Sequence, residues 1–142
     1  MGRGGPYPEL PACPAGALFD KIPVDLKEVK AFRPLGFITL PQHLFGAKHS
    51  AFTINLPGEK RANIPVYFPG DAWVTLIVSI KAPMQSGYSL SFYPCRTFKA
   101  YFGHLGKISE RLEAEFQKAE AVCQDFNHDG KNPMKKCHAE VL

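Results

Sequence analysis

Apolar and polar residues alternate along the middle of the chain with the period of two that is typical of β-strands. This alternation runs through residues 51–56, 88–92 and 98–102. The segment from 73 to 80 carries β-branched side chains on both faces, as a strand covered from two sides does. Shorter β-prone segments occupy 37–40 and 64–68. The pattern therefore predicts several short antiparallel strands.

One segment has the period of an amphipathic helix. Ser109 is a favourable N-cap, and Glu110 and Glu113 lie in the first turn, where the helix dipole stabilises negative charge. The apolar positions that follow share one helix face: Leu112, Phe116, Ala119, Val122 and Cys123. We therefore expect a helix from 110 to about 124. With the strands, it predicts a mostly β (α+β) fold, a small antiparallel sheet or sandwich with one helix near its C-terminal side.

The amino-terminal segment differs in composition from the rest of the chain. Residues 1–16 hold four prolines and four glycines and show no periodicity, which is typical of a flexible arm. Residues 18–32 fit either a short strand or a helical turn. Because 142 residues suit one domain, we expect a flexible arm over 1–16 and a single β-rich domain over 17–142.

Charge and hydropathy argue against two classes of partner. The chain has 17 Lys and Arg against 13 Asp and Glu, which gives a formal net charge of +4. The basic residues are scattered and form no stripe, which argues against nucleic-acid binding. No apolar run approaches the ~20 residues of a membrane-spanning helix. We therefore expect neither a nucleic-acid partner nor a membrane span.

The four cysteines bear on the compartment in which the protein works. No Cys-x-x-Cys pair occurs, which argues against a structural zinc site. A disulfide between Cys123 and Cys137 would close a turn-rich loop and contribute ~3 kcal/mol, and we favour it over free buried thiols. Disulfides persist in oxidising compartments, so we expect an extracellular or periplasmic location. The first residues of the chain lack the apolar core of a signal peptide.

Three histidines lie where predicted loops meet predicted strands. His43 and His49 flank a glycine-containing loop, and His104 follows the strand over 98–102. Imidazoles in such positions serve as metal ligands or general bases; the alternative is that each one caps a turn. No His-x-His or His-Glu-x-x-His motif occurs in the chain.

Three tyrosines fall off the inward phase of the predicted strands. They are Tyr67, Tyr93 and Tyr101. Amphipathic rings in these positions would line a groove for sugar rings or a peptide. The alternative is that they are ordinary surface tyrosines.

Two longer segments carry a resemblance to a known family. They read Ile64-Pro-Val-Tyr-Phe-Pro-Gly-Asp-Ala-Trp-Val-Thr-Leu-Ile and Tyr101-Phe-Gly-His104-Leu. The first is similar to the Pro-Val segment, turn and Val-rich strand of the lysostaphin-type (LytM-like) zinc endopeptidases. The second is similar to the Tyr-x-His segment of that family, and His43 and His49 lie where the family has its first metal ligands. The resemblance covers residues 36 to 112.

This resemblance implies a fold, a cofactor and a substrate class. The family has a small antiparallel β-sheet groove that holds one zinc ion, and its members cut peptide cross-links in bacterial cell walls. It implies zinc ligation by His43, His49 and His104, with His104 as the catalytic residue that donates a hydrogen bond to the developing oxyanion. The His-x-x-x-Asp and His-x-His motifs of the family do not occur in this chain.

The missing motifs favour a function without turnover, because a catalytic zinc ion needs three protein ligands and an open position for water. We therefore expect a non-catalytic or degenerate peptidase-like β domain that acts as a binding or assembly module. Its partners would be cell-wall glycan, peptide or copies of itself. The alternative is a zinc-dependent endopeptidase of the lysostaphin type that cuts cell-wall peptides.

Overall fold

The mostly β fold predicted from the sequence is confirmed by the computed structural model, where strands predominate and one α-helix occurs among the described residues. The structure describes residues 7–39, 45–54, 64–83, 86–127 and 130–142. The chain divides into two compact units, a larger one of Met1–Asp20 with Gly70–Leu142 and a smaller one of Lys21–Pro69. The predicted division into an arm over 1–16 and one domain over 17–142 stays a prediction.

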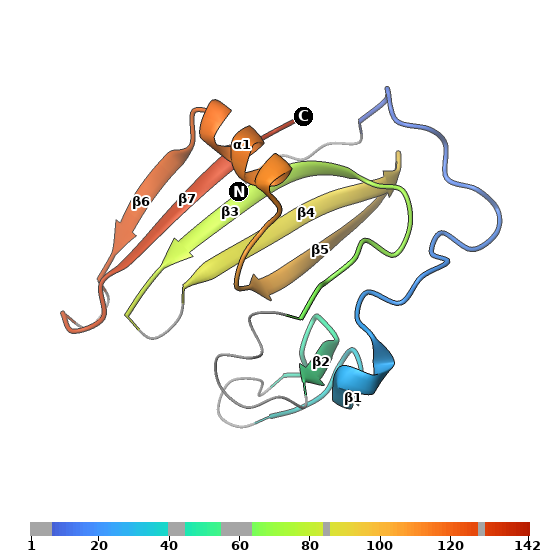
Figure 1. Ribbon diagram of the computed structural model, residues 1–142, viewed down its shortest axis with the longest axis horizontal. Helices are drawn as coiled ribbons and strands as arrows, with labels where there is room; N and C mark the ends of the chain where they lie inside the picture. The colour runs from blue at the N-terminus through green and yellow to red at the C-terminus, as the bar shows by residue number, and fades with distance from the viewer. Residues whose placement is uncertain (1–6, 40–44, 55–63, 84–85, 128–129) are drawn as a thin grey trace. The chain divides into compact units, whose positions relative to one another are not determined.

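The larger unit is built on a five-stranded antiparallel sheet with the strand order β5–β4–β3–β7–β6 (Figure 1). The strands are Trp73–Lys81 (β3), Gly87–Cys95 (β4), Phe98–Leu105 (β5), Val122–Phe126 (β6) and Met134–Glu140 (β7). The β-branched segment predicted over 73–80 forms the central strand, β3. This strand is covered from both faces, since four of its residues are buried: Thr75, Ile77, Val78 and Ser79.

The core of the larger unit lies along β3 and β4. Phe92 and Ile77 are among its largest fully buried side chains. The Phe92 ring packs against Phe102 of β5 with 5.1 Å between ring centroids. Ile77 lies opposite Leu90 of β4 and Ala139 of β7, and all three are buried. Each large apolar side chain buried in this way stabilises the fold by about 1.5–3 kcal/mol.

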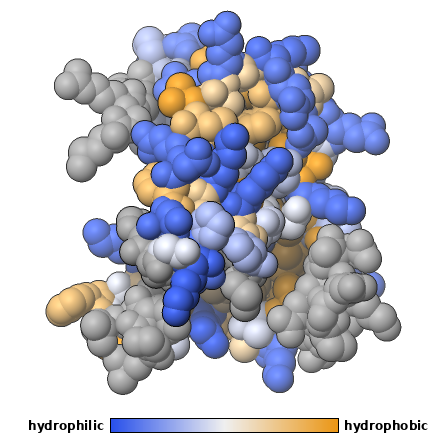
Figure 2. Space-filling view, turned by 90° about the vertical axis from the view of Figure 1, so that its left-hand side faces the viewer, coloured by the Kyte–Doolittle hydropathy of each residue, from blue (hydrophilic) through white to orange (hydrophobic). Residues whose placement is uncertain are grey.

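Polar residues protect the free edge of the sheet at β6. In the part of the chain that the structure describes, β6 pairs with β7 alone, and all its residues except Phe126 are exposed. Gln124 and Asp125 lie on this edge strand, beside Val122, which is 66% exposed. Figure 2 views the molecule from the side of β6, where hydrophilic side chains (blue) stand between apolar areas (orange). Charged and polar edge residues disfavour strand pairing with another chain.

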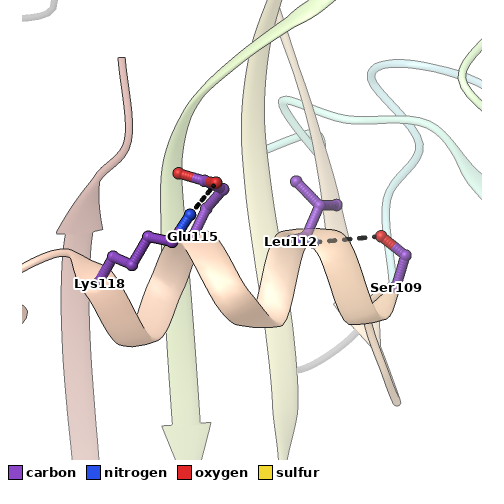
Figure 3. Close-up of polar contacts among 4 residues, drawn as sticks. All are labelled: Ser109, Leu112, Glu115 and Lys118. Atoms are coloured by element: carbon purple, nitrogen blue, oxygen red, sulfur yellow. Dashed lines mark hydrogen bonds and ion pairs between the residues drawn. The ribbon is translucent and has the colours of Figure 1, made fainter.

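Helix α1 (Glu110–Lys118) begins at the predicted N-cap. The Leu112 amide donates a hydrogen bond to the Ser109 hydroxyl oxygen at 3.3 Å (Figure 3). At the other end, the Lys118 ammonium pairs with Glu115 at 3.1 Å, and both side chains are largely exposed. An N-cap hydrogen bond contributes about 1 kcal/mol, whereas an exposed ion pair contributes little.

The predicted helix over 110–124 is too long. Val122 and Cys123 belong to β6, where Cys123 lies opposite Cys137 of β7 and is joined to it by a disulfide. The helix ends at Ala119, whose backbone is extended (φ −73°, ψ 137°). Strand pairing and the disulfide outweigh helix propensity here, because Cys123 and the β-branched residue Val122 are both weak helix formers.

A second disulfide fastens the amino-terminal segment to the sheet. It joins Cys13 to Cys95, at the end of β4, across 82 positions of sequence. Closing a loop of this length stabilises the fold by about 4.5 kcal/mol if the effect is purely one of chain entropy. The Thr97 hydroxyl donates to Cys13 Sγ at 3.2 Å, since a disulfide sulfur carries no proton. The two disulfides use all four cysteines, which is typical of an oxidising, extracellular-type environment.

Further contacts hold the same amino-terminal segment. The Tyr7 and Tyr93 rings meet edge to face with 5.1 Å between centroids. The Arg96 amide donates to the Pro11 carbonyl at 2.8 Å, and the Arg96 guanidinium Nε donates to the Leu10 carbonyl at 3.1 Å. Leu10 is buried. Residues 7–13 are therefore packed against β4 and the turn that follows it.

The smaller unit holds a 3-10 helix, η1 (Leu26–Glu28), and a two-stranded antiparallel sheet of β1 (Val29–Arg33) and β2 (Ala51–Ile54). The predicted strand over 51–56 is confirmed for 51–54, and its last two residues lie outside the described residues. The ambiguous segment 18–32 contains both the 3-10 helix and most of β1. The ends of this unit meet where the Lys21 amide donates to the Pro69 carbonyl at 3.0 Å.

Two β-prone segments of the smaller unit, 64–68 and 37–40, form no regular strand in their described residues, and residue 40 lies outside them. Residues 64–68 contain Pro65, which has no amide proton to donate to a ladder, and the Tyr67 amide donates to the Pro23 carbonyl at 2.8 Å. Within 37–39, Thr39 forms an isolated bridge. No helix among the described residues is long and apolar enough to cross a membrane.

Gly87 allows β4 to approach β5 closely. A Cβ atom at residue 87 would collide with the carbonyl oxygen of Leu105, and φ at Gly87 is 155°. We predict that Gly87→Ala lowers the free energy of unfolding by about 2 kcal/mol or more, measured by urea denaturation. Gly16→Ala is the matched control, because nothing lies within 4 Å of its Cβ position, and its effect should stay within ~0.5 kcal/mol. Equal effects of the two substitutions would contradict the close approach.

Candidate ligand-binding site

One row of side chains crosses four strands on the same face of the sheet. Ser79 of β3 lies opposite Tyr88 of β4 and Cys137 of β7, and Cys137 lies opposite Cys123 of β6. Directly opposite residues of antiparallel strands project to the same face. We call these four residues the floor strip. The Tyr88 ring contacts Phe116 of α1, so the floor strip faces the helix.

Helix α1 lies over one face of the sheet (Figure 1). A cavity remains between the helix and the floor strip. None of the residues of α1 is buried, although the Phe116 ring meets the Tyr88 ring edge to face with 6.3 Å between centroids. The remaining space, here called the α1 cavity, has a volume of about 250 Å³. The floor strip lines it from the sheet, and Glu113, Phe116 and Gln117 line it from the helix. This volume lies just below the ~300–1,000 Å³ of usual ligand pockets and corresponds to about one amino-acid residue.

Glu113 is the central polar group of the α1 cavity. The Tyr88 hydroxyl donates to Glu113 Oε2 at 2.9 Å, and the Gln117 amide nitrogen Nε2 donates to Glu113 Oε1 at 2.9 Å. Burial raises the pKa of the Tyr88 hydroxyl, and the hydrogen bond to Glu113 and its negative charge raise that pKa further. The phenol therefore remains a proton donor well above neutral pH.

Two lysines form the next row on the same face. Lys81 of β3 lies directly opposite Lys135 of β7, and each is two residues from a member of the floor strip. Both line the α1 cavity. Within the described ranges, the ion pairs join Lys27 to Asp25 and Lys118 to Glu115, and neither lysine of this row takes part in one. Like charges directly opposite one another are destabilising, so this row gains from a bound anion.

A second, more open cavity of about 500 Å³ shares three residues with the first. Tyr88, Glu113 and Gln117 line both. Lys107 and Ile108, in the segment that leads into α1, line the second cavity alone. The hydrogen-bonded network of Glu113 therefore faces two spaces beside the same helix.

The predicted metal ligands lie in different parts of the chain. His49 belongs to the smaller unit, where its ring lies 5.9 Å from the Phe37 ring, centroid to centroid. His104 belongs to β5 in the larger unit, and His43 lies outside the described residues. Among the residues that the structure describes, no group of three or more His, Cys, Asp or Glu side chains is placed to hold a metal ion. Zinc ligation by these three histidines and a catalytic role for His104 stay predictions.

The backbone at His104 is unusual. Its φ of 59° lies in the left-handed region, and no other described non-glycine residue has a positive φ. The register of β5 against β4 shifts between Tyr88 and Leu90, and His104 lies in the resulting bulge. Bulges of this kind change the direction of a side chain and often lie beside functional sites.

The three predicted groove tyrosines differ in exposure and in the unit to which they belong. Tyr93 is 4% exposed and packs against Tyr7, so its ring belongs to the interior and does not line an open groove. Tyr101 is 54% exposed on β5, and Tyr67 is 59% exposed in the smaller unit. A binding role for Tyr67 and Tyr101 stays a prediction.

Comparisons with protein-family models, curated proteins and solved structures found no match to this chain. The interpretation of the α1 cavity therefore rests on its geometry. Sequence reasoning missed this cavity, although one signal was present. The spacing of two between Ser79 and Lys81, and between Lys135 and Cys137, places each pair on one face of a strand. The two pairs form one site only because β3 and β7 are neighbours in the sheet. The sequence does not show that these strands are neighbours.

We predict that Tyr88 titrates at higher pH in the folded protein than in the urea-unfolded chain. Because folding raises this pKa, the protonated Tyr88 contributes to the free energy of unfolding. This contribution is fully present below the unfolded pKa and is lost as pH rises through the folded pKa. Glu113→Gln removes the negative charge beside the phenol and should lower the Tyr88 pKa partway, since burial remains. The measurement is a ¹³Cζ NMR titration of Tyr88 in each variant.

Glu110→Gln is the matched control for this titration. Glu110 lies on the same helix and lines only the second cavity, so its substitution should move the Tyr88 midpoint less than Glu113→Gln does. An unchanged midpoint in Glu113→Gln would contradict the hydrogen bond between Tyr88 and Glu113.

Proposed function

We propose that this protein is a non-catalytic peptide-binding module that works in an extracellular or periplasmic compartment. The α1 cavity is the observation that carries this proposal. Its volume of about 250 Å³ accommodates one residue of a peptide, and its walls offer hydrogen-bonding groups beside aromatic rings. The two disulfides support a compartment that is oxidising.

The chemistry of the cavity wall favours a peptide over a glycan. A peptide bond both donates and accepts hydrogen bonds, and the wall presents the Ser79 hydroxyl, the Glu113 carboxylate and the Gln117 amide. Sugar rings are commonly held by stacking on an open aromatic face. Here Tyr88 and Phe116 meet edge to face, which occupies part of their ring surface. The cavity therefore offers these hydrogen-bonding groups beside a larger apolar surface.

Two further points support this proposal, one on turnover and one on the class of ligand. The cysteines that line the cavity, Cys123 and Cys137, form a disulfide and present no thiolate nucleophile. The resemblance to the lysostaphin-type endopeptidases implies the same class of ligand, because those enzymes act on cell-wall peptides.

The proposal is tested by titrating the ¹⁵N-labelled protein with a library of N-acetylated tripeptides that have free carboxyl termini. We expect some of these peptides to shift the backbone amide signals of Ser79 and Cys137, which line the cavity floor. Gln117→Trp places an indole over the cavity from an exposed helix position and should abolish these shifts. Lys118→Trp is the matched control, since residue 118 is the next helix position and does not line the cavity.

Two results would contradict the proposal. One is that no peptide shifts the floor amides, and the other is that Gln117→Trp binds as well as the unmodified protein. The peptides should also be recovered uncleaved by mass spectrometry. Cleavage that a zinc chelator stops would favour the endopeptidase alternative.

A further inference from the structure

The α1 cavity holds more positive than negative charge. Lys81 and Lys135 lie at one end of it, and Glu113 on the helix is the carboxylate among its lining residues. The Glu113 oxygens already accept hydrogen bonds from Tyr88 and Gln117 at 2.9 Å each. The lysines, by contrast, take part in no ion pair within the described residues. The unmatched charge in the cavity is therefore positive.

Asp125 is the acidic residue that the sheet places nearest in register to this pair. It belongs to β6 and lies opposite Lys135. Although this register brings the two residues onto the same face, they form no ion pair in the described structure, and Asp125 is exposed. Asp125 therefore lowers the positive potential at Lys135 without occupying its ammonium group.

The size of the cavity restricts what that anion belongs to. A volume of about 250 Å³ lies just below the ~300–1,000 Å³ of usual ligand pockets, so the cavity holds about one residue, and the last residue of a chain meets this limit without a second exit. The end of a peptide carries a carboxylate, and the amide nitrogen of its last residue is a donor for which the Glu113 carboxylate is a suitable acceptor. Lysine ammonium groups bind carboxylates by charge-assisted hydrogen bonds, and Lys81 and Lys135 are both exposed to an incoming ligand.

From this arrangement we infer that the α1 cavity recognises the C-terminal carboxylate of its peptide, held between Lys81 and Lys135. This inference rests on the proposed function and names the chemical group that the site selects. The carboxylate relieves the repulsion between the two opposed ammonium groups, so the row of like charges becomes part of the binding site. The floor strip and Phe116 then contact the side chain of the last residue.

The test uses pairs of probes that differ in charge alone. N-acetylleucine and N-acetylleucinamide, and the tripeptide hits as free acids and as carboxamides, are titrated into the whole protein by NMR. We expect the dissociation constant of each carboxamide to be at least about tenfold higher than that of the acid. Raising the salt concentration should weaken binding of the acids more than that of the amides.

Three substitutions locate the effect. Lys81→Gln and Lys135→Gln should each remove most of the difference between acid and amide. Lys136→Gln is the matched control, because Lys136 is next in the same strand, pairs with Ile80, and lies on the opposite face of the sheet. It should leave the difference within about twofold. Dispersed amide spectra and intact disulfides confirm that each variant is folded.

The outcomes separate this inference from the proposed function. Equal binding of acids and amides at the floor amides would overturn the carboxylate inference and leave peptide binding standing. The carboxylate inference would also be overturned if Lys136→Gln removed the difference between acid and amide while Lys81→Gln and Lys135→Gln left it unchanged. A third result also overturns the carboxylate inference. If peptides that end in Glu bind equally well as carboxamides and as acids, whereas other carboxamides bind weakly, the cavity recognises an acidic side chain. If no probe shifts the floor amides, both proposals fail.

Discussion

Backbone pairing between β3 and β7 is the interaction on which the candidate site depends. These strands are distant in sequence, and their register sets Ser79 opposite Cys137 and Lys81 opposite Lys135. A slip of one residue would turn one set of side chains to the other face of the sheet. The cavity floor would then lose Cys137, and the two lysines would no longer share a row. The Cys123–Cys137 disulfide links the outer strand β6 to β7 and so completes the floor.

The helix above this floor is held in a different way. No residue of α1 is buried, so packing contributes less here than it does along β3. Its position relative to the sheet depends on the hydrogen bond between Tyr88 and Glu113 and on the contact of Phe116 with the Tyr88 ring. Elements with few buried contacts open at low free-energy cost, and binding sites are commonly built on them. A rigid, cross-linked floor beneath a loosely packed helix suits a cavity that admits and retains a ligand.

The sequence predicted the parts of this fold that depend on local patterns. The β-branched segment over 73–80 forms the central strand, and Ser109 caps the helix, because burial on both faces and N-capping leave clear signals. The end of the helix was predicted wrongly, since Val122 and Cys123 fit a helical stripe but find partners in β7. The alternation of residues along its strand placed Tyr93 in a groove, but its ring is buried against Tyr7. Tyr7 belongs to the amino-terminal segment, which carries no periodic signal that could predict this contact. The α1 cavity escaped prediction because it arises from the register of strands that are distant in sequence.

Cross-strand nuclear Overhauser effects report which residues of β3 and β7 lie opposite each other. We expect contacts between the backbones of Ser79 and Cys137 and between those of Lys81 and Lys135. Contacts that place Ser79 opposite Lys136 or His138 instead would contradict the register, and with it the cavity floor and the lysine row.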